Sequence, residues 1–236
     1  HHQGERDCQR RQARPRIEVA ILLTTAFLPP LEYVAAIAEG MVLSRDRVVP
    51  SAVYLEAFEN YQKQSWRNRC RILGPRGRED WSFPIVHRNG SHNGIPITEL
   101  EIDWSGDWLR RFKGALETAY GSSAFFEYYY DGLRDILDSR PLRLWDFNLL
   151  CLEWLLSALG VPAELGSSIS YGRCPVENVL DLRTAFHPKR ENDYLACHGL
   201  GRPYFQVFSP RFGFTAGLSA VDLLFNEGPA SITYLL

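Results

Sequence analysis

The sequence predicts a single-domain α/β fold in which a mixed sheet is covered by helices. A stretch at residues 17–24 that is rich in Val, Ile and Leu has the composition of a buried central strand, and a proline pair with a helical apolar pattern follows it at 29–39. The middle third of the chain is helical in pattern, whereas shorter β-like segments precede and follow it. A chain of 236 residues is long enough to bury a core of this kind.

The first strand ends where Thr24 and Thr25 begin a loop. Leu31 starts a helix that Gly40 ends, and the two preceding prolines suit a helix start, where a missing N–H costs little. In α/β folds the loop after such a strand lies at the carboxyl edge of the sheet, where ligands bind. This loop has no glycine-rich phosphate cradle, which argues against a Rossmann or P-loop nucleotide site.

Further strands are predicted from runs of β-branched and aromatic residues. A second long strand occupies 48–58. A β-hairpin is expected near 70–86, because β-like runs at 70–73 and 81–86 flank a Gly-Pro-Arg-Gly turn. The remaining predicted strands lie at 95–102, at 169, at 179–183 and at 204–208.

The helices of the middle third are predicted from apolar residues at helical spacing. Near the C-terminus, Ser219 and Asp222 have capping-box spacing and indicate a further helix that ends before Gly228. We expect these helices to cover the sheet. The middle helices run from a cap at Asp107 to Gly121, over 125–137, and from a cap at Asp146 to Gly160.

The composition is that of an ordinary globular protein, with 45% hydrophobic and 23% charged residues. A net charge of −2 argues against a dedicated DNA-binding protein and against nucleic acid as a partner. The five cysteines are odd in number and form no C-x-x-C pair, which is typical of reduced thiols in the cytoplasm. The sequence therefore predicts a cytoplasmic protein without a metal site and without a cofactor.

The N-terminal residues 1–15 are expected to be a disordered lead-in to one domain at 16–236. Their basic charge and the apolar run behind it superficially resemble a signal peptide, but Pro29 and Pro30 follow where a small-residue cleavage site would be needed. No apolar run reaches the roughly 18 residues of a membrane-spanning helix. We therefore expect no membrane span.

The segment at 59–71 combines amides, cations and aromatic residues and is the strongest candidate for a binding site. From Asn60 to Arg78, a stretch that extends beyond this segment, the chain has six cations and no acidic residue. Amides read hydrogen-bonding groups, and Arg and Lys hold phosphate or carboxylate, so the segment predicts a polar or anionic ligand. A solvated basic helix is the alternative, although Asn60, Gln64 and Asn68 cluster at helical spacing. The predicted substrate-binding residues here are Asn60, Tyr61, Lys63, Gln64, Arg67, Asn68 and Arg69.

Two candidate catalytic residues lie in a later loop. His187 is the kind of residue that serves as a general acid or base near neutral pH, and Lys189 beside it could hold an anion. An exposed histidine among surface cations is the alternative. Gln206 lies between Phe205 and Val207 in an otherwise apolar strand and could face the same site, so we count it among the substrate-binding residues. Glu56 and Glu59, which precede the amides and cations of the polar segment (residues 59–71), could act as a base or bind an ammonium group.

Seven short motifs occur in a fixed order along the chain, at residues 22–33 (LLTTAFLPPLEY), 59–72 (ENYQKQSWRNRCRI), 119–129 (AYGSSAFFEYY), 146–148 (DFN), 187–189 (HPK), 204–208 (YFQVF) and 218–229 (LSAVDLLFNEGP). Together they resemble the WbqC-like protein family of bacteria. This resemblance implies a place in surface-polysaccharide biosynthesis and an aminoacyl transferase role on a sugar. One branch of that family has a His-Gln-Pro start to the first loop, whereas this chain has Thr24-Thr25-Ala26 and resembles the other branch.

The leading hypothesis is a transferase that moves a glycine-like aminoacyl group onto an amino sugar, carried as a nucleotide-sugar or on a lipid diphosphate. His187 would be the general base, Lys189 would stabilise the acyl oxyanion, and the amide and cation side chains would hold the substrate. The alternative is a non-catalytic binding protein for a nucleotide or another anionic ligand. RNA binding is a third hypothesis, which the acidic net charge opposes.

Overall fold

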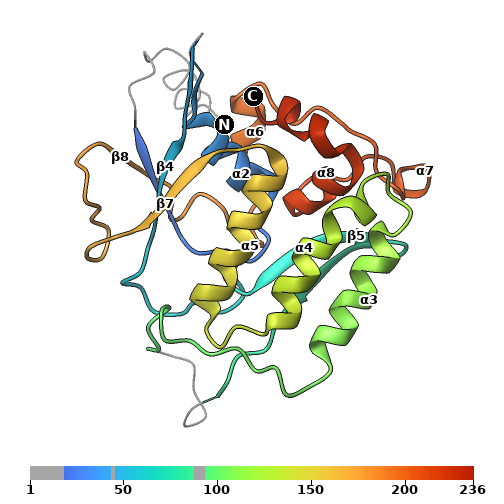
Figure 1. Cartoon of the computed structure of the whole chain (residues 1–236), viewed down its shortest axis with the longest axis horizontal. Helices are drawn as coiled ribbons and strands as arrows, with labels where there is room; N and C mark the ends of the chain where they lie inside the picture. The colour runs from blue at the N-terminus through green and yellow to red at the C-terminus, as the bar shows by residue number, and fades with distance from the viewer. Residues whose placement is uncertain (1–18, 44–45, 88–93) are drawn as a thin grey trace.

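A four-stranded parallel sheet forms one side of the molecule (Figure 1). The computed structural model describes residues 19–43, 46–87 and 94–236. The strand order is β7-β4-β1-β8, with β1 and β4 in the centre. The strand predicted at 17–24 is confirmed, although residues 17–18 and the predicted lead-in at 1–15 lie outside the described residues. The strands are β1 (Ala20–Leu23), β4 (Ser51–Leu55), β7 (Ala163–Ser167) and β8 (Val179–Asp181).

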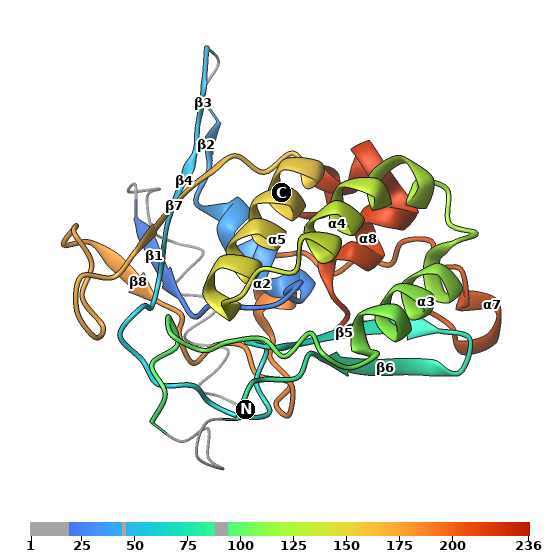
Figure 2. The same cartoon turned by 60° about the horizontal axis from the view of Figure 1, so that its bottom comes forward.

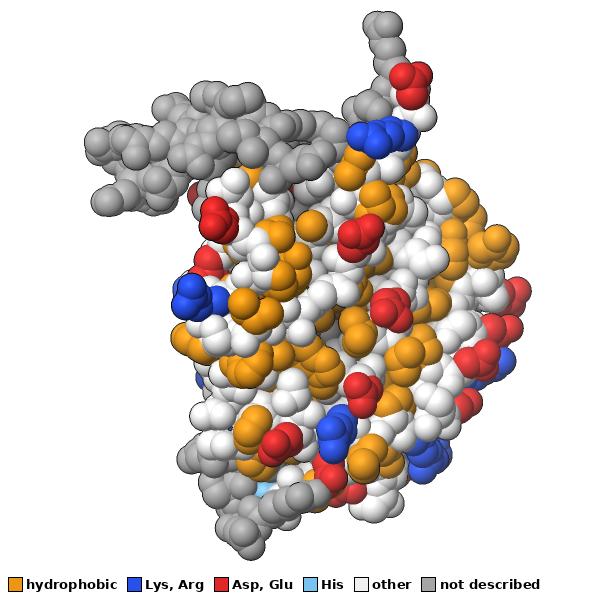
Figure 3. Space-filling view, turned by 60° about the vertical axis from the view of Figure 1, so that its left-hand side comes forward, with side chains coloured by type: hydrophobic (Ala, Val, Ile, Leu, Met, Phe, Trp, Pro, Cys, Tyr) orange, Lys and Arg blue, Asp and Glu red, His pale blue; other side chains and the backbone are white. Residues whose placement is uncertain are grey.

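Parallel pairing follows from the chain path, because α2 (Leu31–Glu39) connects β1 to its neighbour β4. Helices α2 and α5 (Leu144–Leu159) lie on the same side of the sheet (Figure 2). In β4, buried residues alternate with half-exposed Ala52 and Tyr54, as in a strand with only one face on the core. Figure 3 views the sheet side, where apolar side chains are interspersed with single acidic and basic ones. A short antiparallel pair, β2 (Val42–Leu43) and β3 (Val48–Val49), precedes β4.

The predicted hairpin is confirmed, and it is separate from the parallel sheet. Strands β5 (Arg69–Gly74) and β6 (Gly77–Ser82) pair in antiparallel register, with Arg71 opposite Asp80. Cys70 and Ile72 point into the core, which α3 closes from the other side, so Arg69 and Arg71 lie on the outer face. The expected mixed sheet is therefore divided into a parallel sheet and an antiparallel hairpin.

The helical middle third is confirmed as three helices that close one common core. Its centre is Phe27 from the loop after β1, whose ring contacts Phe83 at 5.1 Å and Phe147 at 5.3 Å between centroids. This aromatic packing joins the sheet, the hairpin and the helices into one domain. The three middle helices are α3 (Trp108–Tyr120), α4 (Phe126–Ser139) and α5. The later helices are α6 (Tyr194–Cys197), α7 (Ser209–Phe212), α8 (Ala220–Glu227) and the 3₁₀ helix η1 (Gly228–Tyr234).

Some local predictions are wrong. The segment at 95–102 makes only isolated bridges, such as Asn60 with Pro96, and 204–208 leads as a loop into α7. Strand β7 was not predicted, because it is an edge strand whose exposed Glu164 and Gly166 break the apolar run. Neither Asp107 nor Asp146 caps its helix through its side chain. By contrast, Ser219 caps α8 by accepting the Val221 N–H at 3.3 Å.

Candidate functional site

The loop after β1 holds the polar segment in place at the carboxyl edge of the sheet. The Phe27 N–H donates to the Trp66 carbonyl at 2.8 Å. From α5, the buried Asn148 amide donates to Thr25 Oγ1 at 3.0 Å and to the Arg67 carbonyl at 2.7 Å. The polar segment is thus anchored where ligands bind in open parallel sheets.

The polar segment forms turns, so its expected helical spacing is wrong. Gln64 adopts a left-handed conformation with φ of 56°, and Ser65 Oγ donates to the Gln62 carbonyl at 2.7 Å. Such side-chain bonds compete with helical ones and favour turns. Asn60, Gln64 and Asn68 therefore do not share a helix face.

Three of the predicted binding residues are used inside the protein. Arg67 donates two hydrogen bonds of 2.7 Å each to the Glu59 carboxylate, and both side chains are buried. Asn68 accepts from the Tyr61 hydroxyl at 3.1 Å and donates to the Phe83 carbonyl at 2.9 Å. These contacts stabilise the turns, and a ligand role for Tyr61, Arg67 and Asn68 stays a prediction.

The other predicted residues of the segment lie nearer to solvent. Asn60, Lys63 and Gln64 are exposed, and Arg69 is half-buried beside Ser82 and Asp80, at 3.3 and 3.5 Å. Within the described residues Lys63 forms no ion pair, so its charge is available. Asn60, Lys63, Gln64 and Arg69 are therefore the members of the predicted set that a ligand could reach.

The loop between β8 and α6, residues 182–193, is named the His187 loop here. It packs directly against the polar segment, although more than a hundred residues separate the two in sequence. Lys189 Nζ donates to Gln64 Oε1, and Arg71 Nη2 donates to the Pro188 carbonyl at 3.2 Å. Arg71 is itself held by Asp80 at 2.7 Å. The predicted catalytic loop and the predicted binding segment therefore share one surface.

His187 has a defined hydrogen-bonding state in this loop. The Lys189 backbone N–H donates to its Nδ1 at 3.1 Å, so the neutral ring carries its proton on Nε2. Burial, with the neighbouring Arg190 and Lys189 charges, lowers the pKa of His187 below its usual 6.5. At neutral pH the ring is thus uncharged and presents an N–H donor. This state differs from the general base expected from sequence, which needs a free lone pair.

Glu32 is a further candidate, which the sequence analysis did not single out. It lies in the first turn of α2, is only 9% exposed, and accepts a 3.2 Å hydrogen bond from Asn192 of the His187 loop. Burial raises the pKa of Glu32, against the lowering effects of that bond and of nearby Arg71. Its place just after the strand-loop unit was the available signal.

Glu56 directly follows β4 and is fully buried. Burial acts to raise its pKa, but hydrogen bonds from Ser168, Gly172 and Phe58, with the Arg183 guanidinium at 3.0 Å, outweigh burial and lower it. This carboxylate ties the connection after β7 to the sheet edge. With these donors in place, the expected role of Glu56 as a base or an ammonium ligand has no free lone pair to support it.

Gln206 lies in a different place from the other predicted residues. It is fully buried, donates to Asp222 Oδ2 at 2.9 Å and to the Thr215 carbonyl at 2.8 Å, and accepts the Thr215 N–H at 2.9 Å. The Tyr204 hydroxyl donates to the same Asp222 oxygen at 2.6 Å. Asp222 therefore binds this loop, and its side chain does not complete the expected capping box.

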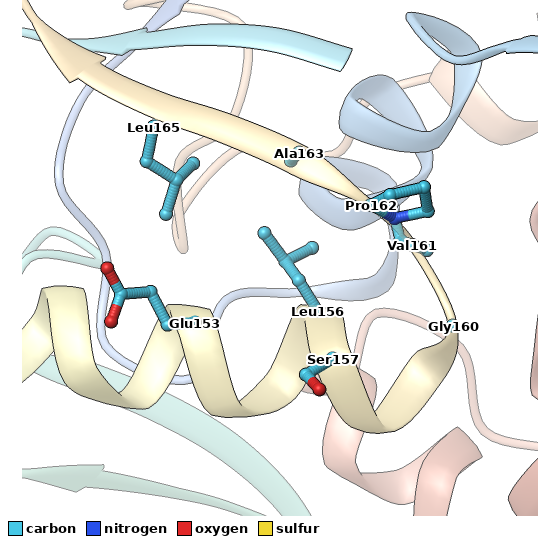
Figure 4. A pocket seen from close by; sticks show the side chains of 8 residues that line it. All are labelled: Glu153, Leu156, Ser157, Gly160, Val161, Pro162, Ala163 and Leu165. Atoms are coloured by element: carbon cyan, nitrogen blue, oxygen red, sulfur yellow. The ribbon is translucent and has the colours of Figure 1, made fainter. Parts of the chain in front are cut away.

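A hollow of about 530 Å³ lies between α5 and β7 (Figure 4). It opens near the amino end of the parallel strands, opposite the edge that carries the His187 loop. Among the described residues that line it, Glu153 is the only one with an ionisable side chain. Within residues 19–43, 46–87 and 94–236, no group of three His, Cys, Asp or Glu side chains could hold a metal ion. No helix in these ranges is long and apolar enough to cross a bilayer.

The sequence model of the WbqC-like protein family matches residues 26–199. The chain belongs to this family. The matched part of the WbqC-like chain contains the polar segment, Glu32 and the His187 loop, and it ends before Gln206. An uncharacterised protein of Mycobacterium tuberculosis, Rv1507c, is 28% identical over 198 residues, which cover 74% of this chain and 83% of the relative. No solved structure matches this WbqC-like protein significantly.

Proposed function

We propose that this WbqC-like protein is a cytoplasmic transferase of surface-polysaccharide biosynthesis. It transfers a glycine-like aminoacyl group from an activated ester or thioester to the amine of an amino sugar, which is carried on a nucleotide or lipid diphosphate. The observation that supports this most is the contact of the His187 loop with the polar segment through Lys189 and Gln64. One face then offers cations for phosphate beside groups suited to acyl transfer.

In this proposal the diphosphate binds Lys63, and Lys189 serves the acyl oxyanion. Neither lysine forms an ion pair within the part of the chain that the structure describes, whereas Arg67 and Arg71 are held by Glu59 and Asp80. Exposed ammonium groups bind phosphate as point charges and are released from it by salt. Asn60 and Gln64 lie in the same segment and supply amides for sugar hydroxyls.

The acyl transfer assigns different roles to Glu32 and His187. The amine attacks the acyl carbonyl, a C–N bond forms, and Glu32 takes the amine proton as general base. His187 Nε2–H donates to the developing oxyanion, together with the Lys189 charge. When the intermediate collapses, the bond to the leaving group breaks, and the Glu32 proton passes to that group. The raised pKa of Glu32 suits a base that works near neutral pH.

The test is product formation followed by mass spectrometry, with nucleotide amino sugars as acceptors and glycyl thioesters or glycyl-tRNA as donors. We expect a mass increase by one glycyl group, a loss of about 10²–10⁴-fold in rate in Glu32→Gln, and a comparable loss in His187→Ala. Lys113→Ala, on the far helix α3, is the matched control and keeps the rate. Unchanged rates in both site variants would refute the assignment.

The second candidate is a binding protein without catalysis, and the bonded Nδ1 of His187 favours it. That bond occupies a lone pair that an imidazole base needs. The buried thiols also fail as nucleophiles, since burial raises the pKa of Cys70 and Cys151. Calorimetry separates the two candidates. A binding protein keeps its affinity for the nucleotide-sugar in His187→Ala, loses it in Lys63→Ala, and forms no product.

A further inference from the structure

The tip of the hairpin and the loop around α7 together form a basic and aromatic edge. Three phenylalanines of this loop are exposed, with Phe205 at 61%, Phe212 at 37% and Phe214 at 36%. They come from ten consecutive residues, 205–214, and exposed aromatic side chains that share one surface loop suit an interaction site. We name this surface the Arg-Phe edge and define it as Arg76, Arg78, Phe205, Arg211, Phe212 and Phe214.

Two elements meet at the Arg-Phe edge. Arg211 Nη1 donates to the Pro75 carbonyl in the hairpin turn at 2.8 Å, and the Phe212 ring lies beside Gly77. Gly77 has φ of 111°, which only glycine adopts without strain, so this residue permits the tight turn. The Phe212 ring lies against the side of the turn where another residue would carry its Cβ. The α7 loop and the hairpin tip lie side by side at one margin of the molecule in both views (Figures 1 and 2).

The charge on this edge is positive and uncompensated. Arg76, Arg78 and Arg211 form no ion pair within the described residues. Pairing of Leu73 with Arg78 puts Arg78 on the outer hairpin face, where Asp80 is already held by Arg71. Glu79 faces the opposite side and binds the Trp81 indole at 3.1 Å, and Glu227 accepts the Phe205 N–H at 3.3 Å.

We propose that the Arg-Phe edge docks the protein onto the surface of an anionic phospholipid bilayer. Arginines hold lipid phosphates, while phenylalanine rings enter the boundary between headgroups and acyl chains. A projecting edge reaches a flat surface, whereas single-stranded nucleic acid lies along a groove lined by stacking rings. The proposal is independent of the acyl-transfer chemistry. Docking through this edge would bring the His187 loop close to the membrane, because that loop contacts the same hairpin through Arg71.

The experiment is co-sedimentation of the full chain with vesicles of phosphatidylcholine, with and without phosphatidylglycerol. We expect binding to the anionic vesicles, which salt weakens. Each of Arg76→Gln, Arg78→Gln and Arg211→Gln should reduce the partition coefficient about fivefold, as for about 1 kcal/mol per cation at a charged surface. A variant with Phe205→Ser, Phe212→Ser and Phe214→Ser should reduce it at least as much as one arginine change. Arg110→Gln with Arg134→Gln, exposed on α3 and α4, is the control and should bind as the parent does.

Three results would overturn the proposal. One is absence of the parent protein from the anionic vesicle pellet, and another is equal binding of the parent and the Arg-Phe variants. The third is binding of a single-stranded RNA oligonucleotide that the phenylalanine variant loses, without vesicle binding, which would assign the edge to nucleic acid. Circular dichroism confirms that each variant is folded. If the triple phenylalanine variant fails to fold, Phe212→Ser alone decides.

Discussion

Arg67 and Glu59 show how a cation expected to bind a ligand serves the fold instead. Their paired hydrogen bonds of 2.7 Å lie in a buried environment, where each charge requires the other. Asn68 is satisfied in the same way by Tyr61 and Phe83. The cations that remain available to a ligand are those without an ion pair among the described residues, above all Lys63 and Lys189.

Removal of Arg67 should destabilise the protein strongly. Arg67→Ala leaves the Glu59 carboxylate buried and unpaired, so we expect a loss of about 3 kcal/mol in the free energy of unfolding. Denaturant unfolding measures this loss. The exposed pair of Arg110 and Asp107 provides the control, since Arg110→Ala should cost less than about 0.5 kcal/mol. Equal effects of the two changes would contradict a buried ion pair.

Glu32 should behave as a residue retained for function at some cost in stability. Its folded-state pKa lies above the unfolded value of about 4.5, so its deprotonation costs stability as pH rises through the unfolded pKa to the folded one. Glu32→Gln keeps the acceptor for Asn192 and removes this cost. Thermal unfolding can be followed from about pH 4 to about pH 8, a range in which a carboxyl group with a raised pKa loses its proton. At neutral pH the Glu32→Gln variant should be at least as stable as the parent. A large loss of stability there would indicate a structural role.

The protonation of His187 should depend on its cationic neighbours. Proton NMR of the ring should give a pKa below 6.5, because burial and adjacent positive charges disfavour the imidazolium. Lys189→Met removes one of these charges and should raise the pKa toward 6.5. A parent pKa at or above 6.5 would contradict the environment described for this ring. In a catalytic protein the acidic limb of the pH–rate profile should move upward with this variant.

At the scale of elements, a buried carboxylate joins the C-terminal helix to the loop before it. Asp222 of α8 accepts hydrogen bonds from Tyr204 and Gln206, which lie in the loop that carries the Arg-Phe edge. Burial raises the pKa of Asp222 against these bonds. The hydrogen bonds thus fix a loop that has no strand or long helix of its own.

Removal of one donor from this cluster should have a measurable cost. Tyr204→Phe leaves the Asp222 oxygen with one bond fewer in a buried place, and we expect a loss of about 1–3 kcal/mol in the free energy of unfolding. Tyr128→Phe serves as the matched control, because Tyr128 is mostly exposed on α4. Chemical denaturation compares the two, and equal stabilities would show that the Tyr204 bond contributes nothing.

At the scale of the whole molecule, one amide connects three distant parts of the chain. Asn148 of α5 binds Thr25 after β1 and the carbonyl of Arg67 in the polar segment. Because it is buried, the connection holds the polar segment against the sheet edge. The position of the candidate site thus depends on the packing of the complete domain.

Loss of this connection should loosen the polar segment before the rest of the fold. Asn148→Ala leaves the Arg67 carbonyl without this donor, so hydrogen exchange at residues 61–68 should quicken more than at 108–120 in α3. The free energy of unfolding should fall by about 2 kcal/mol. A uniform increase in exchange across both regions would show that Asn148 stabilises the domain only globally.

The sequence by itself determined the elements with a strong periodic signal. The strand before Thr24, the helix from Leu31, the hairpin, the three middle helices and α8 follow from local apolar patterns and glycine ends. Prediction from the sequence failed where the local signal is weak. It missed the edge strand β7, whose residues are not a continuous apolar run. It also predicted strands at 95–102 and at 204–208, where the backbone forms isolated bridges or a turn. The family also followed from the order of short motifs.

Only the tertiary structure decided which polar side chains remain free. From Asn60 onward the charged residues of the polar segment are all cations, yet in the structure Arg67 is paired with Glu59 and Arg71 with Asp80, whereas Lys63 is paired with no described residue. The contact of Lys189 with Gln64 and the donor state of His187 likewise depend on packing between distant segments. Periodicity reports which side of an element is buried, whereas hydrogen bonding and burial across the fold determine the charge and availability of each side chain.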